Sequence, residues 1–243
     1  MFELSQVGLK YGTEPALAEI SLAIDAGEQV ALIGPSGAGK TSLLALLNGR
    51  LFPTEGEVRV KGNNLDELST KELRVMRQAL AWIPQDLGLI PSLRVAQNVA
   101  CGQVGKKGFW GLLRSFLFMS RAEKEAIGKR LEEVGVLEKM FQRVDHLSGG
   151  QQQRAAVARA LYQGPTAILA DEPVSAVDPE RGRDLIKLLV KVSREQGVTL
   201  VTSLHDVSLA LESFDRVIGL REGRIVFDGR PSEEELTSLY QLS

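Results

Sequence analysis

The sequence lacks features that are typical of disulfide-bonded, nucleic-acid-binding, membrane-spanning and secreted proteins. It holds one cysteine, Cys101, among 243 residues, which excludes a disulfide within the chain and suits a reducing compartment. The net charge is only −2, so no strong positive field favours nucleic acid. No apolar run approaches the roughly 18 residues that a membrane span needs, and no secretory signal is visible. We therefore expect a chain that is soluble by itself and reaches a membrane only through a partner.

What is present suits a folded α/β protein. Apolar residues make up 44% of the chain, enough for a buried core. After residue 165, apolar strands alternate with amphipathic helices, and this rhythm predicts a mainly parallel sheet covered by helices. Residues 86–165 have a mostly helical pattern. We expect a single domain in which residues 1–85 and 166–230 form the core, residues 86–165 a helical subdomain, and residues 231–243 a C-terminal helix.

Local patterns give the expected elements. Short apolar stretches predict strands at 20–24, 28–34 and 80–84, and "GEVRVKG" at 56–62 is typical of an edge hairpin strand. Ile127, Leu131 and Val134 recur at helical spacing and predict one buried face of a helix. A second hairpin is expected to turn at Glu222 and Gly223. The N-terminal strands indicate a small antiparallel portion beside the parallel sheet.

The segment "GPSGAGKT" carries the clearest chemistry. It follows a predicted strand that ends at Ile33 and precedes a predicted helix, which is the context of a phosphate-binding loop. Glycines let backbone N–H groups converge on phosphate oxygens, and the helix N-terminus adds partial positive charge. Lys40 is expected to bridge the β- and γ-phosphates and Thr41 to ligate Mg²⁺. The predicted nucleotide-binding residues here are Gly34, Pro35, Ser36, Gly37, Ala38, Gly39, Lys40, Thr41 and Ser42.

Two acidic residues and one histidine follow other predicted strands. Asp171 ends the apolar run "AILAD" and Glu172 follows it, at the carboxyl edge where open α/β sheets bind ligands. Asp171 is expected to hold Mg²⁺, and Glu172 to accept a proton from the attacking water. His205 follows the strand "VTLVTS" and could reach the γ-phosphate. His146 has no strand context, and we expect it to be structural or at the surface.

These motifs together resemble the ATP-binding-cassette (ABC) ATPases. The resemblance rests on "GPSGAGKT", Gln85 after a short strand, "LSGGQQQR", "ILADEP" followed by "SAVD", and His205, in that order. It implies a P-loop NTPase core of RecA-like fold with an inserted helical subdomain. It also implies a head-to-tail dimer of two copies that encloses two ATP molecules. Each phosphate loop would face the glycine turn of the other copy.

The resemblance assigns further roles by position. Tyr11 resembles the aromatic residue that stacks on adenine, and Gln85 the glutamine that contacts Mg²⁺ and the attacking water. Asp178, which closes "SAVD", resembles the aspartate of the loop that crosses the dimer, and His205 resembles the switch histidine. Ser148 suits a helix N-cap, and Gly149 and Gly150 leave the first N–H groups of the following helix open to an anion. The residues expected to contact the other copy's nucleotide are Ser148, Gly149, Gly150 and Gln151.

The resemblance also indicates partners. The chain has one cassette and no coiled-coil heptads, unlike translation-type and chromosome-type ATPases. We expect a transporter subunit on the cytoplasmic face of the inner membrane, with separate permease subunits, an extracytoplasmic solute-binding protein, and no nucleic acid. The motifs are most similar to ATPase subunits of phosphonate importers, although Pro84 before the glutamine and the form "SAVD" depart from that pattern. Alternatives are an importer of another solute, an exporter or lipid-handling ATPase, and a non-transport ATPase that gates a soluble assembly.

One segment before "LSGGQQQR", which we call the signature, is long and apolar. Lys106, Lys107 and Arg114 are interleaved with an apolar set that comprises Phe109, Trp110, Leu112, Leu113 and Phe116. Core packing of an amphipathic helix is one interpretation. The other is a groove that receives a short helix of the membrane subunit.

Overall fold

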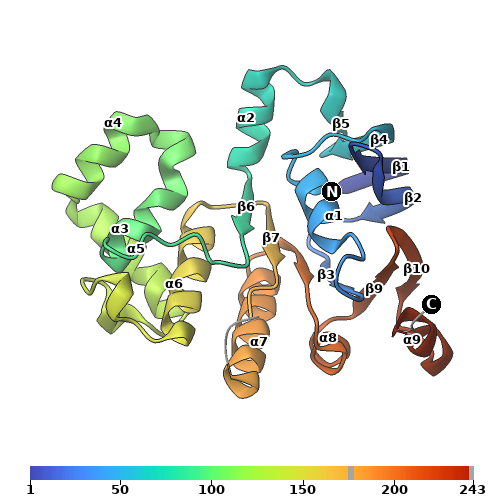
Figure 1. Cartoon of the computed structure of the whole chain (residues 1–243). Helices are drawn as coiled ribbons and strands as arrows, with labels where there is room; N and C mark the ends of the chain where they lie inside the picture. Colours follow the sequence, from blue (N-terminus) through green and yellow to red (C-terminus); the bar gives the residue numbers. More distant parts are fainter. Residues whose placement is uncertain (175–177, 241–243) are drawn as a thin grey trace.

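A computed structural model describes residues 1–174 and 178–240, and a mainly parallel sheet lies at its centre (Figure 1). Within these residues six strands follow the order β10-β9-β3-β8-β7-β6. All neighbouring pairs are parallel except β9 with β10. The strands are β3 (Gln29–Ile33), β6 (Leu80–Ile83), β7 (Ala167–Asp171), β8 (Thr199–Ser203), β9 (Arg216–Arg221) and β10 (Arg224–Gly229). This arrangement confirms the predicted fold class, and β9 and β10 turn at Glu222 and Gly223 as expected.

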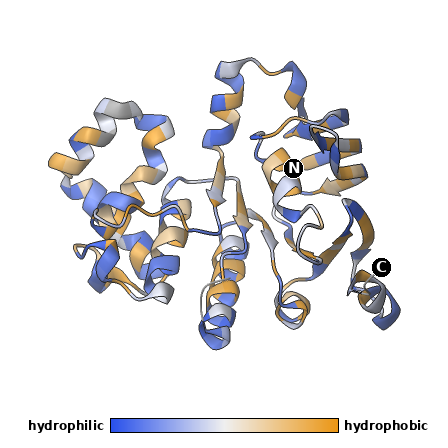
Figure 2. Cartoon of the chain, viewed as in Figure 1, coloured by the Kyte–Doolittle hydropathy of each residue, from blue (hydrophilic) through white to orange (hydrophobic). Residues whose placement is uncertain are grey.

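The central strands are apolar because helices cover both faces of the sheet. Every residue of β3, β7 and β8 is buried, as continuous apolar runs predict for parallel strands. The covering helices are α1 (Lys40–Leu47), α6 (Gly149–Tyr162), α7 (Pro179–Glu195) and α8 (Val207–Ser213). Figure 2 shows that α7 mixes hydrophobic and hydrophilic residues around its axis, and Leu185, Ile186 and Leu189 form its buried side.

A smaller antiparallel sheet has the order β2-β1-β4-β5. Its strands are β1 (Phe2–Tyr11), β2 (Glu14–Ile24), β4 (Glu55–Val60) and β5 (Asn63–Asn64). β4 forms the expected hairpin with β5, although it is not a free edge along its whole length, because β5 pairs with Arg59 and Val60 and β1 pairs with the other side. Apolar residues of this sheet pack with α1 in one buried cluster.

The helical subdomain lies on the opposite side of the parallel sheet (left in Figure 1). It contains α3 (Val95–Ala100), α4 (Val104–Leu117), α5 (Arg121–Glu133) and the signature helix α6, with short 3-10 turns at Cys101–Gln103, Leu137–Lys139 and Val144–His146. Ile127, Leu131 and Val134 are almost fully buried, which confirms the predicted apolar face. The remaining α-helices of the described residues are α2 (Thr70–Gln78) and α9 (Glu233–Tyr240).

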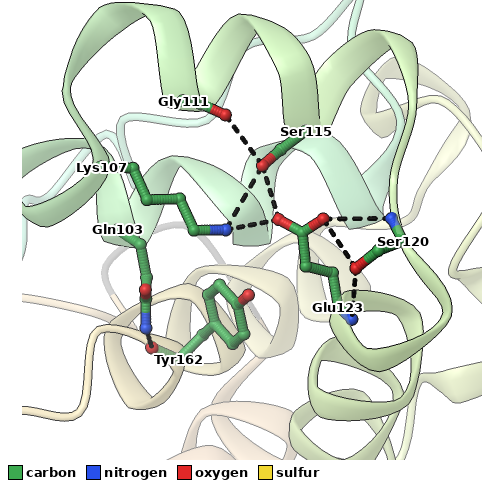
Figure 3. A network of polar contacts seen from close by, with 7 residues as sticks. All are labelled: Gln103, Lys107, Gly111, Ser115, Ser120, Glu123 and Tyr162. Carbon is green, nitrogen blue, oxygen red and sulfur yellow. Dashed lines mark hydrogen bonds and ion pairs between the residues drawn. The ribbon is translucent and has the colours of Figure 1, made fainter.

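Helix α4 is bent, and a polar cluster holds it against α5. The bend is at Gly108, which has a φ of 68°. Glu123 Oε1 accepts from Lys107 Nζ, before the bend, at 2.5 Å and from Ser115 Oγ, after it, at 2.6 Å (Figure 3). Burial would raise the pKa of Glu123, but these bonds and those from Ser120 lower it to about 2. The cluster therefore ties both halves of α4 to the start of α5.

In the long apolar segment before the signature, some residues pack in the core and others are exposed, so neither core packing nor a partner-binding groove accounts for the whole segment. Phe116 packs against the core, whereas the Trp110 side chain is 78% exposed. The side chains of Phe109 and Leu112 lie outside the described part of the chain. Within the described residues, no helix is both long and apolar enough to cross a bilayer.

Candidate active site

The phosphate loop joins β3 to α1 and leaves the helix N-terminus open. Gly39 is the N-cap of α1, with a φ of 101° and no side-chain capping bond. A Cβ at Gly39 would lie 2.7 Å from Leu17 Cδ2, so glycine is required both for the left-handed conformation and for space. The hairpin turn supports the loop, because Gly223 N donates to Ala38 O at 3.2 Å. Uncapped N–H groups at a helix start form an anion site.

Lys40 is buried inside the loop. Its Nζ donates to Gly34 O at 2.8 Å and to Pro35 O at 3.1 Å, and the residue is 5% exposed. Burial lowers the pKa of Lys40, while the nearby carboxylates of Glu172 and Asp171 oppose this shift. A buried ammonium with only two carbonyl partners keeps a donor for a phosphate oxygen.

Asp171 is the meeting point of three elements. Its Oδ1 accepts from Thr41 Oγ1 at 3.1 Å and from Ser203 Oγ at 2.8 Å. Thr41 comes from α1, Asp171 ends β7, and Ser203 ends β8, where it is the register partner of Asp171. The Thr41 hydroxyl and the Asp171 carboxylate thus present hard oxygen ligands side by side, which fits Mg²⁺. No cluster of three or more His, Cys, Asp or Glu was found in the part that the structure describes, so phosphate and water oxygens would complete the shell.

Glu172 and His205 form a contact at the same sheet edge. Glu172 Oε1 lies 2.6 Å from His205 Nε2, and the Glu172 side chain is 14% exposed against 49% for His205. Glu172 has a φ of 46°, an unfavourable backbone conformation for a residue with a side chain. Its N–H donates to Ser203 Oγ at 2.9 Å, which holds that conformation in place. Ser203 therefore positions both acidic residues.

A cleft of about 550 Å³ unites most of the predicted residues. Gln85 lies on its wall, and Tyr11 stands at its rim, 54% exposed, with its hydroxyl 3.3 Å from Ser42 Oγ. The predicted residues that line the cleft are Tyr11, Ser36, Gly37, Ala38, Gly39, Lys40, Thr41, Ser42, Gln85, Glu172 and His205. Glu14, Pro15 and Ala16 complete the wall beside Tyr11. The predicted residues Gly34, Pro35 and Asp171 are not among the lining residues, although Asp171 contacts Thr41, which is.

The signature residues do not line this cleft within the described chain. Ser148 is the N-cap of α6, as predicted: its Oγ accepts from Gln151 N at 3.4 Å, and Gln151 Oε1 accepts from Ser148 N at 3.1 Å. The Gln151 side chain thus closes a capping box. Asp178 caps α7 by accepting from Glu180 N at 2.9 Å. The rest of "SAVD", residues 175–177, lies outside the described residues.

The sequence did not predict the role of Ser203 or the contact by which Gly223 supports the phosphate loop. Ser203 had a usable signal, since it ends an apolar strand beside the strand that carries Asp171. Recognising it required the strand order, because β7 and β8 are separated in sequence by the whole of α7. The contact between Gly223 and Ala38 had no local signal, because the two residues meet only after the sheets pack.

The fold and the cleft define a P-loop ATPase of the cassette class. Over residues 17–175 the sequence matches the ABC transporter family. The chain belongs to that family, and it is an ATPase whose hydrolysis of ATP drives transport.

Individual relatives extend the match to nearly the whole chain. A phosphonates import ATP-binding protein of Wolinella succinogenes is 41% identical, over 99% of this chain and 88% of that protein. A protein of the same description from Halalkalibacterium halodurans is 40% identical, over 99% and 94%. A dimeric ATP-binding cassette bound to ADP and phosphate superposes with a TM-score of 0.78 at 31% identity, over 95% of this chain and 98% of that one. CbiO1 of Clostridium perfringens, part of the cbiONQ transporter complex, gives 0.83 at 27% identity, over 98% and 92%.

Proposed function

We propose that the chain is the ATP-hydrolysing subunit of an importer for phosphonates or a related phosphorus oxyanion. The site geometry carries the catalytic part of this proposal, because Thr41 of the phosphate loop contacts Asp171, and Glu172 and His205 line the same cleft as the loop. The printed descriptions of the relatives support the substrate class.

In this proposal each residue has a defined task. The open amides of α1 and Lys40 hold the phosphates, and Tyr11 stacks on adenine. Thr41, Asp171 and Gln85 would hold Mg²⁺, which neutralises charge that develops on the phosphates. Glu172 accepts a proton from the attacking water, and His205 orients Glu172 and contacts the γ-phosphate.

The active unit is a head-to-tail pair of this chain. The signature turn of Ser148, Gly149, Gly150 and Gln151 lies outside the chain's own cleft, so it is available to a nucleotide held by a second copy. Asp178, at the start of α7, would lie along the contact between the copies. The relative in the ADP-bound structure is a dimer, which supports this arrangement. We place the pair on the cytoplasmic face of the inner membrane, beneath two permease subunits and, indirectly, an extracytoplasmic binding protein.

Reconstitution of the transporter tests both the transported solute and the assignment of the chain to an importer. The transporter is reconstituted with its permease and binding protein, and ATP hydrolysis is measured with a phosphonate, phosphite, phosphate or no solute. We expect stimulation by one of the phosphorus oxyanions, and none in a Glu172→Gln transporter. Stimulation by an unrelated solute alone would overturn the substrate class and leave an importer of another solute. Recovery of the chain only with non-membrane proteins would instead favour an ATPase that gates a soluble assembly.

A further inference from the structure

Three large apolar side chains lie exposed on one face of α4. Trp110 is 78% exposed, Phe118 76% and Leu117 65%, and among the described residues no other large apolar side chain is as exposed as these. Together with Arg114 they follow the spacing i, i+4, i+7 and i+8, which places all four on one side of a helix. Figure 1 shows α4 at the periphery of the helical subdomain, away from the central sheet. We call these four residues the outer face of α4.

The opposite side of the same helix is already packed. Ser115 is buried and donates to Glu123 Oε1 at 2.6 Å, and Phe116 packs against the core. A surface helix normally turns its large apolar side chains inward, and a cluster of them on the solvent side marks contact with another surface. Core packing therefore does not account for the outer face.

The charge around the outer face is of one sign. Residues 104–121 hold four basic residues and no aspartate or glutamate: Lys106, Lys107, Arg114 and Arg121. The chain as a whole is slightly acidic, with a net charge of −2. Lys107 pairs with Glu123 and Arg121 with Glu125, whereas no carboxylate of the described residues pairs with the exposed Arg114. The outer face thus combines apolar side chains with a positive charge that no acidic side chain offsets.

We propose that the outer face of α4 binds the surface of a membrane that contains anionic lipids. At such a surface, aromatic and aliphatic side chains enter the boundary between headgroups and acyl chains, and tryptophan is enriched there. Basic side chains contact the phosphates of the headgroups. Helix α4 has 14 residues, too few to cross a bilayer, so it lies along the surface.

The inference goes beyond the proposed function, which brings the chain to the inner membrane only through the permease. One helix face with a single free cation gives weak and reversible binding. In the assembled transporter such a contact adds to the affinity for the permease, because it confines both partners to one membrane.

The polar cluster behind α4 fixes the outer face before it meets lipid. Glu123 accepts from Lys107 before the bend at Gly108 and from Ser115 after it (Figure 3). Ser115 follows Arg114 in the chain, yet Ser115 is buried in the cluster while Arg114 is exposed. A surface that is already ordered loses less conformational entropy when it binds.

Vesicle binding by the full chain tests the lipid contact without any permease. The purified chain is sedimented with vesicles of phosphatidylcholine alone and with vesicles that contain about one-third phosphatidylglycerol. We expect at least about fivefold more bound chain on the anionic vesicles. Equal binding to both kinds of vesicle, or binding to neither, would overturn the inference.

The two tryptophans of the chain allow the contact to be located. Trp110 lies on the outer face, whereas Trp82 belongs to β6 and its Nε1 is buried. Lipids brominated on their acyl chains quench the fluorescence of a tryptophan that enters the interface. We expect brominated anionic vesicles to quench Trp82→Phe, which keeps Trp110, and to leave Trp110→Phe unquenched. Equal quenching of the two variants would contradict the assignment of the contact to α4.

Matched substitutions test the apolar part of the contact. Phe118→Ser is expected to reduce vesicle binding at least about tenfold. Phe141→Ser is the control, because Phe141 is 60% exposed but lies outside α4, and this variant should bind as wild type does. Nucleotide binding is measured for each variant as a test of folding.

Charge reversal tests the cationic part. Arg114→Glu should reduce binding to the anionic vesicles about tenfold. Lys71→Glu makes a charge change of the same sign on the exposed surface of α2 and should have a much smaller effect. Equal losses for Arg114→Glu and Lys71→Glu would mean that net charge alone drives binding, and the outer face would be wrong.

The outcomes separate this inference from the proposed function. Absence of vesicle binding removes the lipid contact and leaves the transporter proposal standing, because the vesicles hold no permease. Recovery of no multi-spanning protein by a chain that does bind vesicles removes the transporter proposal instead. If Phe118→Ser lowers recovery of the permease while vesicle binding is unchanged, the outer face is a protein contact and the inference is wrong.

Discussion

Glu172 Oε1 and His205 Nε2 lie 2.6 Å apart at the carboxyl ends of neighbouring strands β7 and β8. Glu172 is mostly enclosed, whereas His205 is half exposed toward the cleft. The imidazole therefore lies between the carboxylate and the space expected to hold the γ-phosphate. This geometry suits a histidine that orients the general base and senses the nucleotide.

Removal of that imidazole is expected to affect hydrolysis more than binding. His205→Ala should lower the ATPase rate by about 10²-fold or more, because Glu172 loses its orienting partner. Nucleotide affinity should change little, since the phosphate loop is intact. The other histidine provides the control: the His146 side chain is 71% exposed, and His146→Ala should leave the rate unchanged. Equal rates for the two variants would contradict the role given to His205.

Ser203 should matter for both stability and activity. Ser203→Ala removes the donor to Asp171 and the acceptor for Glu172 N–H, and we expect a loss of about 1–3 kcal/mol in the free energy of unfolding. Hydrolysis should fall as well, because the backbone at Glu172 is no longer held. Denaturant unfolding and ATPase assays measure the two effects.

A second buried serine is the matched control. Ser193 is fully buried, and its Oγ has no hydrogen-bond partner in the described structure. Ser193→Ala should therefore be neutral or stabilising. A larger loss for Ser193→Ala than for Ser203→Ala would show that the hydrogen bonds of Ser203 contribute little.

Much of this site could be predicted because its signals are local. The loop from Gly34 to Thr41 follows a strand and opens a helix, and Asp171 and Glu172 end an apolar run; both patterns are contained in short stretches. Helix α2 also had a local signal that was overlooked, since Ser69 and Glu72 form a capping box with Glu72 Oε2 at 2.9 Å from Ser69 N. The position of β4 inside its sheet could not be predicted, because the two-residue strand β5 is too short to leave a pattern.

The helical subdomain shows a further limit. Periodicity predicted the buried residues of α5, but the cluster of Lys107, Ser115 and Glu123 depends on the bend at Gly108. Such sites arise from packing, so only the structure brings their members together.

The cluster at Glu123 predicts a pH-dependent stability. The pKa of Glu123 is lowered from 4.5 to about 2. The Glu123 carboxylate therefore stabilises the fold above pH 4.5, and this contribution is lost as the pH falls toward 2. Glu123→Gln should cost about 1–3 kcal/mol at neutral pH, and its difference from wild type should shrink below pH 4.5. Glu125→Gln, which removes an exposed pair with Arg121, should change stability little. A constant difference between wild type and Glu123→Gln from pH 7 to pH 3 would contradict this account.

A substitution of Ser148 tests the pairing of two copies separately from nucleotide binding. Ser148→Arg should leave ATP affinity of the single chain nearly unchanged, because Ser148 lies outside the chain's own cleft. ATP-dependent dimerisation should be lost, since a bulky cation replaces the cap that we propose faces the second nucleotide. Ser69→Arg removes an equivalent capping box on α2 and should dimerise normally. Light scattering with and without ATP distinguishes the two variants.

The central claim is that Glu172 drives hydrolysis at a site shared by two copies of this chain. Its most direct test is the oligomeric state and turnover of Glu172→Gln in the presence of ATP and Mg²⁺. We predict that the variant binds ATP, accumulates as a dimer and loses hydrolysis, because the nucleotide that holds the copies together is no longer consumed. Near-normal turnover, or a variant that stays monomeric while saturated with ATP, would contradict the account.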